Sequence, residues 1–252
     1  LKYLSKNKVS FITTTHYSDL KAFGFENEFG TSFSQGMHFL DFPKFEYGEE
    51  IVESISVLGR AGELTIHTGR YTDTIITNLI EFESETLEEF EEKSEGIRKW
   101  LRKSKIISYT DKEDKYFVVK NVEISEVKRK YGFYGNVTFV FVCEPFAYYE
   151  NGKQIVDHKE ILYNPGIFSQ PIYIITGEGV CTLTVNGKSV TANVGQNITI
   201  DTERMISYRE DGMLQNTAIK GNYEDLYLQE GDNKITVTDG FECKVIPRWR
   251  CL

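Results

Sequence analysis

The chain has 252 residues, of which 40% are hydrophobic and 27% charged, and its formal net charge at pH 7 is −9. This composition is that of a globular protein with room for one large or two ordinary domains, and it excludes a disordered chain. The negative charge argues against nucleic-acid recognition, which needs basic surface to displace counterions from phosphates. No apolar run reaches the roughly 18 residues that cross a bilayer, so we expect synthesis in the cytoplasm and no membrane insertion.

The first 82 residues predict short strands separated by turns. Residues 9–15 are rich in β-branched side chains, and residues 51–58 alternate apolar and polar positions as a half-buried strand does. Glycines on both sides of Arg60 mark a turn, after which residues 63–68 and 74–82 resume the strand pattern. Plentiful Tyr, Phe, Thr, Val and Ile also favour strands over helices.

Residues 24–48 form a long segment that is rich in glycine and aromatic residues and only weakly periodic. This pattern predicts an extended loop or arm. Long loops in compact domains usually serve a function or bind a partner.

One amphipathic helix is expected after Thr86, because Glu89 three residues later completes a capping box. Its apolar stripe recurs at helical spacing, so we expect the helix to lie on a sheet. The stripe consists of Leu87, Phe90, Ser94, Ile97 and Leu101. Trp100 borders the stripe, and we interpret it as a packing residue.

Strands return after the helix, over residues 105–109, 116–120, 122–130 and 136–143, and Pro145 is expected to end this run. Beyond this point no stretch has a helical period, and this change of pattern predicts two domains, residues 1–147 and 148–252. In the second half, turn signals arrive every 8–12 residues and Asn186-Gly187 favours a type I′ hairpin. About eight strands in an antiparallel jelly-roll sandwich are expected.

No residue constellation has the spacing of a catalytic or metal site. The four histidines, at positions 16, 38, 67 and 158, lack close ligands, and the four cysteines, at 143, 181, 243 and 251, form no CxxC. Buried free thiols are expected, with a Cys243–Cys251 disulfide as the alternative. Asp201 and Glu203 share a strand face at a separation that overlaps glycosidase acid–base pairs, but such acids usually serve turns. We therefore expect no enzyme, no cofactor and no metal.

Turn and strand motifs of the second half follow one another in a specific order over some 85 residues. They are Asn164-Pro165-Gly166, Pro171, Ile174-Ile175-Thr176-Gly177-x-Gly179, Val185-Asn186-Gly187, Ile200-Asp201-x-Glu203, Gly221, Leu226, Gly231-x-Asn233-x-Ile235 and Pro247-Arg248-Trp249-Arg250. Together they resemble the C-terminal domain of siphophage distal tail proteins. The stretch from Leu58 to Leu64 and the helix after Thr86 match the N-terminal domain of that family more loosely. Asn222-Tyr223-Glu224 departs from the acidic-aromatic-proline step that often follows the matching glycine.

The resemblance implies a mainly β protein with a β-sandwich-like, ring-forming N-terminal belt domain that carries one α-helix. It also implies a galectin-like or jelly-roll β-sandwich as the C-terminal domain. Such a chain is a structural virion protein that forms a homo-hexameric hub, as one ring or stacked rings, at the distal end of a long non-contractile tail. Its implied partners are the tail-tube protein, the tail-associated fibre or lysin, and baseplate or receptor-binding proteins.

A ring requires two different complementary surfaces on each subunit. The arm at residues 24–48 is the sequence candidate for one of them. Its candidate interface residues are Gly30, Phe33, Met37 and Phe39.

The alternative function is a saccharide-binding module of a phage adhesion device. Tyr208, Tyr223 and Trp249 are the candidate contacts to a sugar or to a protein partner, because aromatic side chains supply such contacts. A second interpretation of Trp249 stays open, in which it fills the sandwich core while Arg248 and Arg250 face water.

Overall fold

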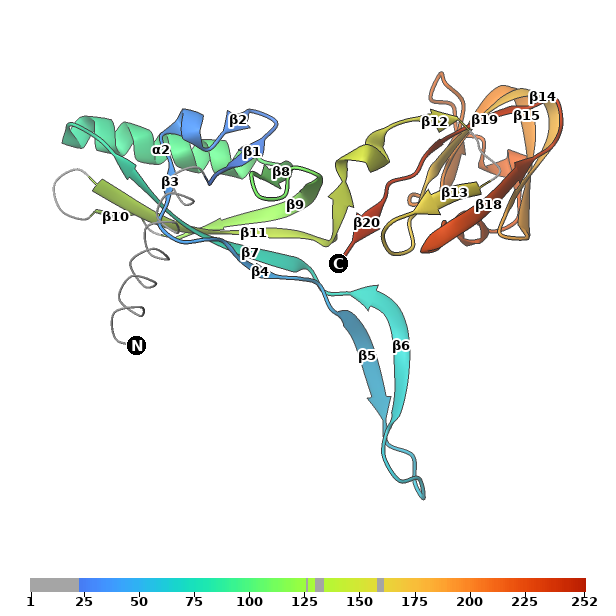
Figure 1. Ribbon diagram of the computed structural model, residues 1–252, viewed down its shortest axis with the longest axis horizontal. Helices are drawn as coiled ribbons and strands as arrows, with labels where there is room; N and C mark the ends of the chain where they lie inside the picture. Colours follow the sequence, from blue (N-terminus) through green and yellow to red (C-terminus); the bar gives the residue numbers. More distant parts are fainter. Residues whose placement is uncertain (1–22, 126, 130–133, 158–160) are drawn as a thin grey trace, which may run out of the picture. The chain divides into compact units, whose positions relative to one another are not determined.

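The computed structural model describes residues 23–125, 127–129, 134–157 and 161–252 (Figure 1). These residues form two compact units, one ending at Ala147 and the other running from Tyr148 to Cys251. Both are built from antiparallel strands, and one α-helix occurs among the described residues, which confirms the mainly β fold class. In the same ranges, no helix is long and apolar enough to span a membrane. The strand predicted at residues 9–15, His16 and His158 lie outside the described residues.

The first unit is organised around one large antiparallel sheet with the strand order β2-β1-β8-β9-β11-β7-β3, to which β4 and β10 add at β7 and β11. Its strands are β1 (Phe25–Asn27), β2 (Gly30–Thr31), β3 (His38–Phe39), β4 (Lys44–Glu46), β7 (Thr74–Glu83), β8 (Ile106–Tyr109), β9 (Lys115–Ile124), β10 (Lys128–Arg129) and β11 (Tyr134–Tyr149). A single 3-10 turn, η1 (Phe33–Gln35), lies between β2 and β3.

An aromatic core lies between layers of this sheet. Along β7, alternate residues such as Ile76 and Ile80 are buried, as the period of two requires. The ring of Phe25 in β1 packs on those of Phe139 and Phe141 in β11, at centroid distances of 5.9 and 5.4 Å. Because β1 and β11 are not neighbours in the strand order, the sheet must fold back over itself.

The predicted helix is present as α2 (Leu87–Lys103), and its start is fixed as the sequence indicates. The Thr86 side chain accepts a hydrogen bond from the Glu89 amide at 3.2 Å. Phe90, Ser94, Ile97, Trp100 and Leu101 are the buried residues of α2. Trp100 is therefore a packing residue, as expected, whereas Leu87 in the first turn is exposed and does not belong to the stripe.

Two expectations about the first unit are wrong. Residues 24–48 are not an extended arm, since they contain β1 to β4 and η1. Strands of two or three residues are too short to show a period in the sequence, although their aromatic residues Phe25 and Phe39 enter the core. Pro145 does not end a strand, because β11 continues through it to Tyr149.

The second unit is an antiparallel fold around the long hairpin of β14 and β15, with a separate buried cluster of apolar residues. Its strands are β12 (Val156–Asp157), β13 (Ile161–Asn164), β14 (Ile172–Val185), β15 (Lys188–Asp201), β16 (Ile206–Tyr208), β17 (Ile219–Lys220), β18 (Gly231–Val237), β19 (Glu242–Ile246) and β20 (Arg250–Cys251). The 3-10 turns η2 (Glu150–Lys153), η3 (Asn216–Ala218) and η4 (Tyr223–Leu226) connect them. Asn186 and Gly187 both have positive φ, 50° and 84°, as a type I′ turn requires, so the predicted hairpin is confirmed.

Strand β14 pairs with β15 along its whole length and with two further strands at its ends. Its first five residues pair with β19, and its last three pair with β18. The strand bends between these segments at Gly177 and Gly179, whose φ values are +153° and +106°. A Cβ on Gly177 would lie 2.4 Å from the ring of Phe241, whereas a Cβ on Gly179 would meet nothing within 4 Å.

Replacing Gly177 with alanine should therefore destabilise the second unit by about 3 kcal/mol, because backbone strain adds to the clash with Phe241. The matched variant Gly179→Ala carries the strain alone and should cost about 1 kcal/mol. Urea unfolding of both variants measures the difference. Equal decreases in the free energy of unfolding for the two variants would show that the contact with Phe241 does not restrict β14.

All four cysteines are free thiols, so the alternative disulfide between Cys243 and Cys251 is not present. Cys143, Cys181 and Cys243 are buried, and burial raises the pKa of Cys143 and of Cys243 to about 12. Cys251 is only half-buried.

A thiol reagent should therefore react rapidly with Cys251 alone in the native protein, because nucleophilic attack needs an accessible thiolate. Ellman's reagent measures this as one fast thiol, rising to four in denaturant. The Cys251→Ser variant should lose the fast phase. Two or more fast thiols in the native wild type would contradict the packing of both cores.

Candidate functional site

A two-stranded ribbon projects from the first unit between β4 and β7 (Figure 1). It consists of β5 (Glu50–Ile55), β6 (Leu64–Tyr71) and the turn between them, and we call residues 50–71 the hairpin. The two strands pair only with each other and form a sheet of their own. Leu58 lies eight residues beyond Glu50, so the ribbon reaches about 27 Å from its base.

The hairpin exposes apolar side chains along its whole length. Those at least one-third exposed are Ile51, Val52, Ile55, Val57, Leu58, Leu64 and Ile66. Leu58, near the tip, is completely exposed. Neither strand has a buried residue, so the sequence expectation of a half-buried strand at 51–58 is wrong. An isolated two-stranded hairpin is marginally stable in water, and exposed apolar patches on proteins generally mark interaction surfaces.

The base of the hairpin is held firmly to the sheet. The amide of Gly48 donates to Thr74 Oγ1 at 3.0 Å, and that hydroxyl donates to the Pro145 carbonyl at 2.8 Å. The Glu49 amide donates to Thr72 Oγ1 at 2.9 Å. A Cβ on Gly48 would lie 2.3 Å from the Thr72 carbonyl oxygen, so only glycine fits at this junction. The base of the ribbon is therefore fixed to the sheet at this junction.

Exposed polar side chains also connect the two strands. The His67 side chain is exposed, and its Nδ1 lies 2.9 Å from Glu50 Oε2. This hydrogen bond lowers the pKa of Glu50. Arg70 lies 3.6 Å from Glu53. Exposed pairs of this kind add little stability, and they give His67 no catalytic setting.

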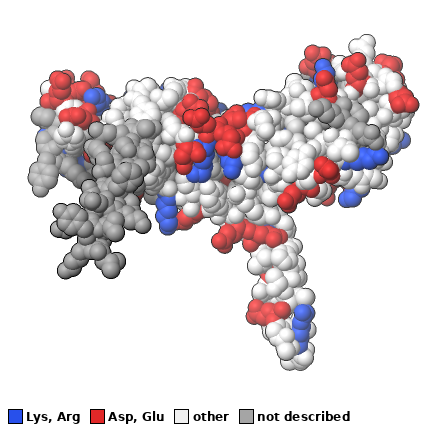
Figure 2. Space-filling view, viewed as in Figure 1, with Lys and Arg blue, Asp and Glu red and all other residues white. Residues whose placement is uncertain are grey.

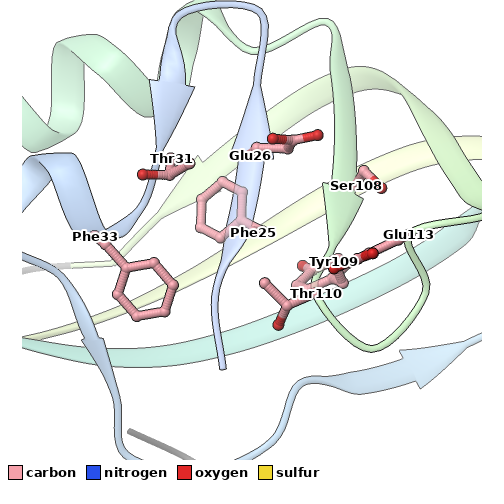
Figure 3. Close-up of a pocket in the computed structure, with 8 residues that line it drawn as sticks. All are labelled: Phe25, Glu26, Thr31, Phe33, Ser108, Tyr109, Thr110 and Glu113. Atoms are coloured by element: carbon pink, nitrogen blue, oxygen red, sulfur yellow. The ribbon is translucent and has the colours of Figure 1, made fainter. Parts of the chain in front are cut away.

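A recess of about 240 Å³ lies elsewhere on the same unit, where β1, β2, η1 and the turn after β8 meet (Figure 3). Its lining residues are Phe25, Glu26, Thr31, Phe33, Ser108, Tyr109, Thr110 and Glu113. Glu26 is paired with Thr31 on one side and with Ser108 on the other, so these three side chains stand in a row across the strands. The side chain of Thr110 holds the turn by hydrogen bonds to the amide and carbonyl of Gly24.

The four predicted interface residues are divided between this recess and the core. Phe33 lines the recess and is 39% exposed, and Gly30 in the adjacent β2 is half-buried. Met37 and Phe39 are buried, and the Phe39 ring packs against Phe23 at 5.0 Å. Met37 and Phe39 therefore stabilise the first unit and cannot contact a neighbouring subunit.

The three candidate sugar contacts do not share one environment. Trp249 is 6% exposed and belongs to the core of the second unit, so it cannot stack on a sugar. Tyr223 is half-buried against the same core, with its hydroxyl 3.5 Å from Ser207 Oγ. Tyr208 is half-buried in β16. The packing of Trp249 bears out the core interpretation of this residue.

Asp201 and Glu203 form an ion cluster with Arg248 rather than an acid–base pair. Arg248 donates from Nη1 and Nη2 to the two Asp201 oxygens at 2.8 and 3.1 Å, and its Nη1 lies 3.0 Å from Glu203 Oε2. Burial opposes ionisation of Asp201, but the hydrogen bonds from Arg248 outweigh it and lower the pKa of the carboxyl. A general acid needs a raised pKa, so this cluster is structural.

Neither arginine of the closing motif points freely into water, which corrects the expectation from alternation. Arg250 is 4% exposed, and its guanidinium lies 4.3 Å from the centre of the Phe168 ring. It also donates from Nε to the Phe168 carbonyl at 2.8 Å and from Nη1 to Gln170 Oε1 at 2.9 Å. Both arginines therefore fasten the end of the chain onto the second unit.

Among the described residues, no group of three or more His, Cys, Asp or Glu side chains could hold a metal ion. The surface features that sequence reasoning missed are the exposure of the hairpin and the recess. The sequence carries one signal for the exposure of the hairpin, which is that Ile51 and Val52 are apolar at adjacent positions. Adjacent residues of a strand point to opposite faces, whereas a half-buried strand keeps its apolar residues on one face.

Comparison with solved structures identifies the architecture. The chain aligns with the crystal structure of SPP1 Dit (gp 19.1), presented as a paradigm of the hub adsorption apparatus of phages that infect Gram-positive bacteria, with a TM-score of 0.63. The alignment covers 88% of this chain and 97% of SPP1 Dit at 12% sequence identity. The fold is that of a phage distal tail protein. This confirms the expected resemblance at the level of the fold.

A second structure, the phage p2 baseplate in its activated conformation with Sr, aligns with a TM-score of 0.40 at 12% identity, over 88% of this chain and 96% of that one. No protein-family model and no curated protein matches the sequence. The alignment with SPP1 Dit thus extends over both compact units of this chain.

Proposed function

We propose that the chain is a structural hub protein at the distal end of a long phage tail, with residues 1–147 as a ring-forming belt domain and residues 148–252 as a galectin-like outer domain. The observation that carries this proposal is the hairpin, a pinned ribbon with apolar side chains exposed on both faces. The distal tail protein fold supports the same function.

Assembly is the function that suits the hairpin best. In the proposed ring, the hairpin of each subunit binds to the next subunit. Each interface therefore joins the hairpin of one subunit to a different surface of its neighbour. Six copies close the ring around the tail channel, and the outer domains face the other baseplate proteins. The partners are the tail-tube protein on one side and the tail-associated fibre or lysin, with baseplate or receptor-binding proteins, on the other.

Virion labelling tests the place of the protein. Antibody raised against the purified chain, with gold-conjugated secondary antibody, should label the distal tip of the tail in electron micrographs of the phage that encodes it. A matched antibody against the major tube protein should label only along the tube. Gold on the capsid, or none on intact virions, would contradict the proposal.

A further inference from the structure

We propose that the recess at β1 and β8 is the receptor for the hairpin tip of a second copy of this chain, with Leu58 and Arg60 as the inserted side chains. This inference rests on the proposed ring and names the two surfaces that meet in it. It follows from the shape of the recess, from charge complementarity and from the fact that one subunit carries both surfaces.

The recess has the size and lining to receive a side chain. Its volume of about 240 Å³ compares with roughly 30 Å³ for one water in the liquid, so it has room for a long side chain. Figure 3 shows Phe33 and Glu113 on opposite sides, with Phe25 between them. The lining thus combines aromatic rings with two carboxylates, Glu26 and Glu113.

Both carboxylates are available to a partner. Glu26 and Glu113 are exposed, and neither forms an ion pair with a described residue. Acidic side chains also gather over the region of β1 and β8 in the space-filling view (Figure 2). A site with aromatic walls and acidic residues selects a side chain that is cationic at its end and apolar along its stem, because ring faces and carboxylates both attract a cation.

The hairpin tip offers that chemistry. Arg60 lies in the turn between β5 and β6, where its amide donates to the Val57 carbonyl at 3.1 Å. Within the part of the chain that the structure describes, its guanidinium has no carboxylate partner, whereas the other arginine of the hairpin, Arg70, lies beside Glu53. Leu58, two residues before Arg60, is completely exposed and supplies the apolar contact. Docking would remove an exposed leucine from water and pair an unpaired charge.

The arrangement also makes the contact heterologous. The tip and the recess are different surfaces of one unit, so each copy can insert its own tip into the next copy while receiving another. Contacts of this type form closed rings when the rotation between neighbours divides a full circle.

Charge reversal tests the recognition. Arg60→Glu should raise the concentration at which rings form by about tenfold or more, as Glu26→Lys combined with Glu113→Lys should. Rings of the triple variant should form at a concentration near that of the wild type, because the pairing is restored with opposite signs. Arg70→Glu and Glu91→Lys, exposed on the hairpin base and on α2, are the matched controls and should assemble normally. Light scattering gives the mass, and circular dichroism checks the fold of each variant.

Mixing two proteins that each carry one new, exposed cysteine tests the contact itself, because the native Cys143, Cys181 and Cys243 are buried. In a Cys251→Ser background, Leu58→Cys protein and Thr31→Cys protein are mixed and oxidised, so that any disulfide between the two new thiols joins different copies. A cross-linked dimer in the mixture, absent from either protein alone, is expected. If wild-type rings form but this dimer does not, and Arg60→Glu assembles normally, the recess is not the receptor, whereas the ring proposal stands. If the wild type itself forms no rings, the ring proposal is wrong, and this inference, which depends on it, is wrong too.

Discussion

Replacing residues 51–70 with Asn-Gly should convert the assembled ring into monomers of about 27 kDa while leaving both units folded, since the whole chain has a mass of 29.1 kDa. The hairpin buries none of its side chains in the first unit, so its loss should change the melting temperature by only a few degrees. Glu50 and Tyr71 are paired across the base, so a two-residue type I′ turn can close the gap. Light scattering and thermal unfolding are the two measurements.

The matched control for this deletion is Leu214→Ser, which changes an exposed leucine of the second unit that the ring proposal does not use. That variant should assemble like the wild type. Rings from the deletion variant would show that the hairpin does not hold the subunits together, and a loss of folded structure would show that the ribbon contributes to the core.

Replacing Arg248 with methionine should destabilise the second unit by about 3 kcal/mol, because it leaves the Asp201 carboxylate buried without its cation. The side chain of Asp201 is 3% exposed and accepts hydrogen bonds from both Nη atoms of Arg248, so water cannot replace the lost partner. Urea unfolding at pH 7 measures the change in the free energy of unfolding.

Arg204→Met is the matched control for this ion pair. The Arg204 side chain is 71% exposed and its Nε lies 3.9 Å from Asp201, so its loss should cost less than about 1 kcal/mol. If Arg248→Met lowers the free energy of unfolding no more than Arg204→Met does, the structural role of the cluster is contradicted.

The same ion pair predicts a pH dependence with a definite sign. Arg248 lowers the pKa of Asp201 in the folded state, so the pair stabilises the protein above the pKa of the unfolded chain, about 3.9. That stability should be lost as pH falls below about 4, through the lower pKa of the folded state. The gap between wild type and Arg248→Met in urea unfolding should therefore narrow from pH 5 to pH 3. A gap that is constant over this interval would contradict the assignment.

Sequence predicts best the features that depend on neighbours in the chain. The Thr86 cap, the turn around Arg60 and the Asn186-Gly187 hairpin are all present, because each follows from local backbone geometry and short-range hydrogen bonds. The mainly β class follows in the same way from composition and turn spacing.

Features that depend on the surroundings of a strand were predicted poorly. The pattern at 51–58 gives the strand β5 but cannot tell whether a core lies beneath it, and the structure leaves it exposed. The glycine-rich sequence of residues 24–48 predicts an extended loop or arm, yet Met37 and Phe39 are held in the core by strands of only two or three residues. The alternation of residues predicts that Arg248 and Arg250 face water. In the structure, Arg248 binds Asp201 and Arg250 packs on the Phe168 ring.

The recess could not be predicted from sequence because its residues come from four short segments. Glu26 and Glu113 are separated by 87 positions and are joined only by the pairing of β1 with β8. Of the predicted interface residues, only Phe33 lines this recess, and its role in an interface stays a prediction.

The mass of the purified chain, measured by light scattering together with negative-stain images, tests the central claim most directly. A hexameric hub predicts a particle of about 175 kDa, six times the chain mass of 29.1 kDa, with a central hole in projection. A particle of 29 kDa at every soluble concentration, with no ring in the images, would contradict it.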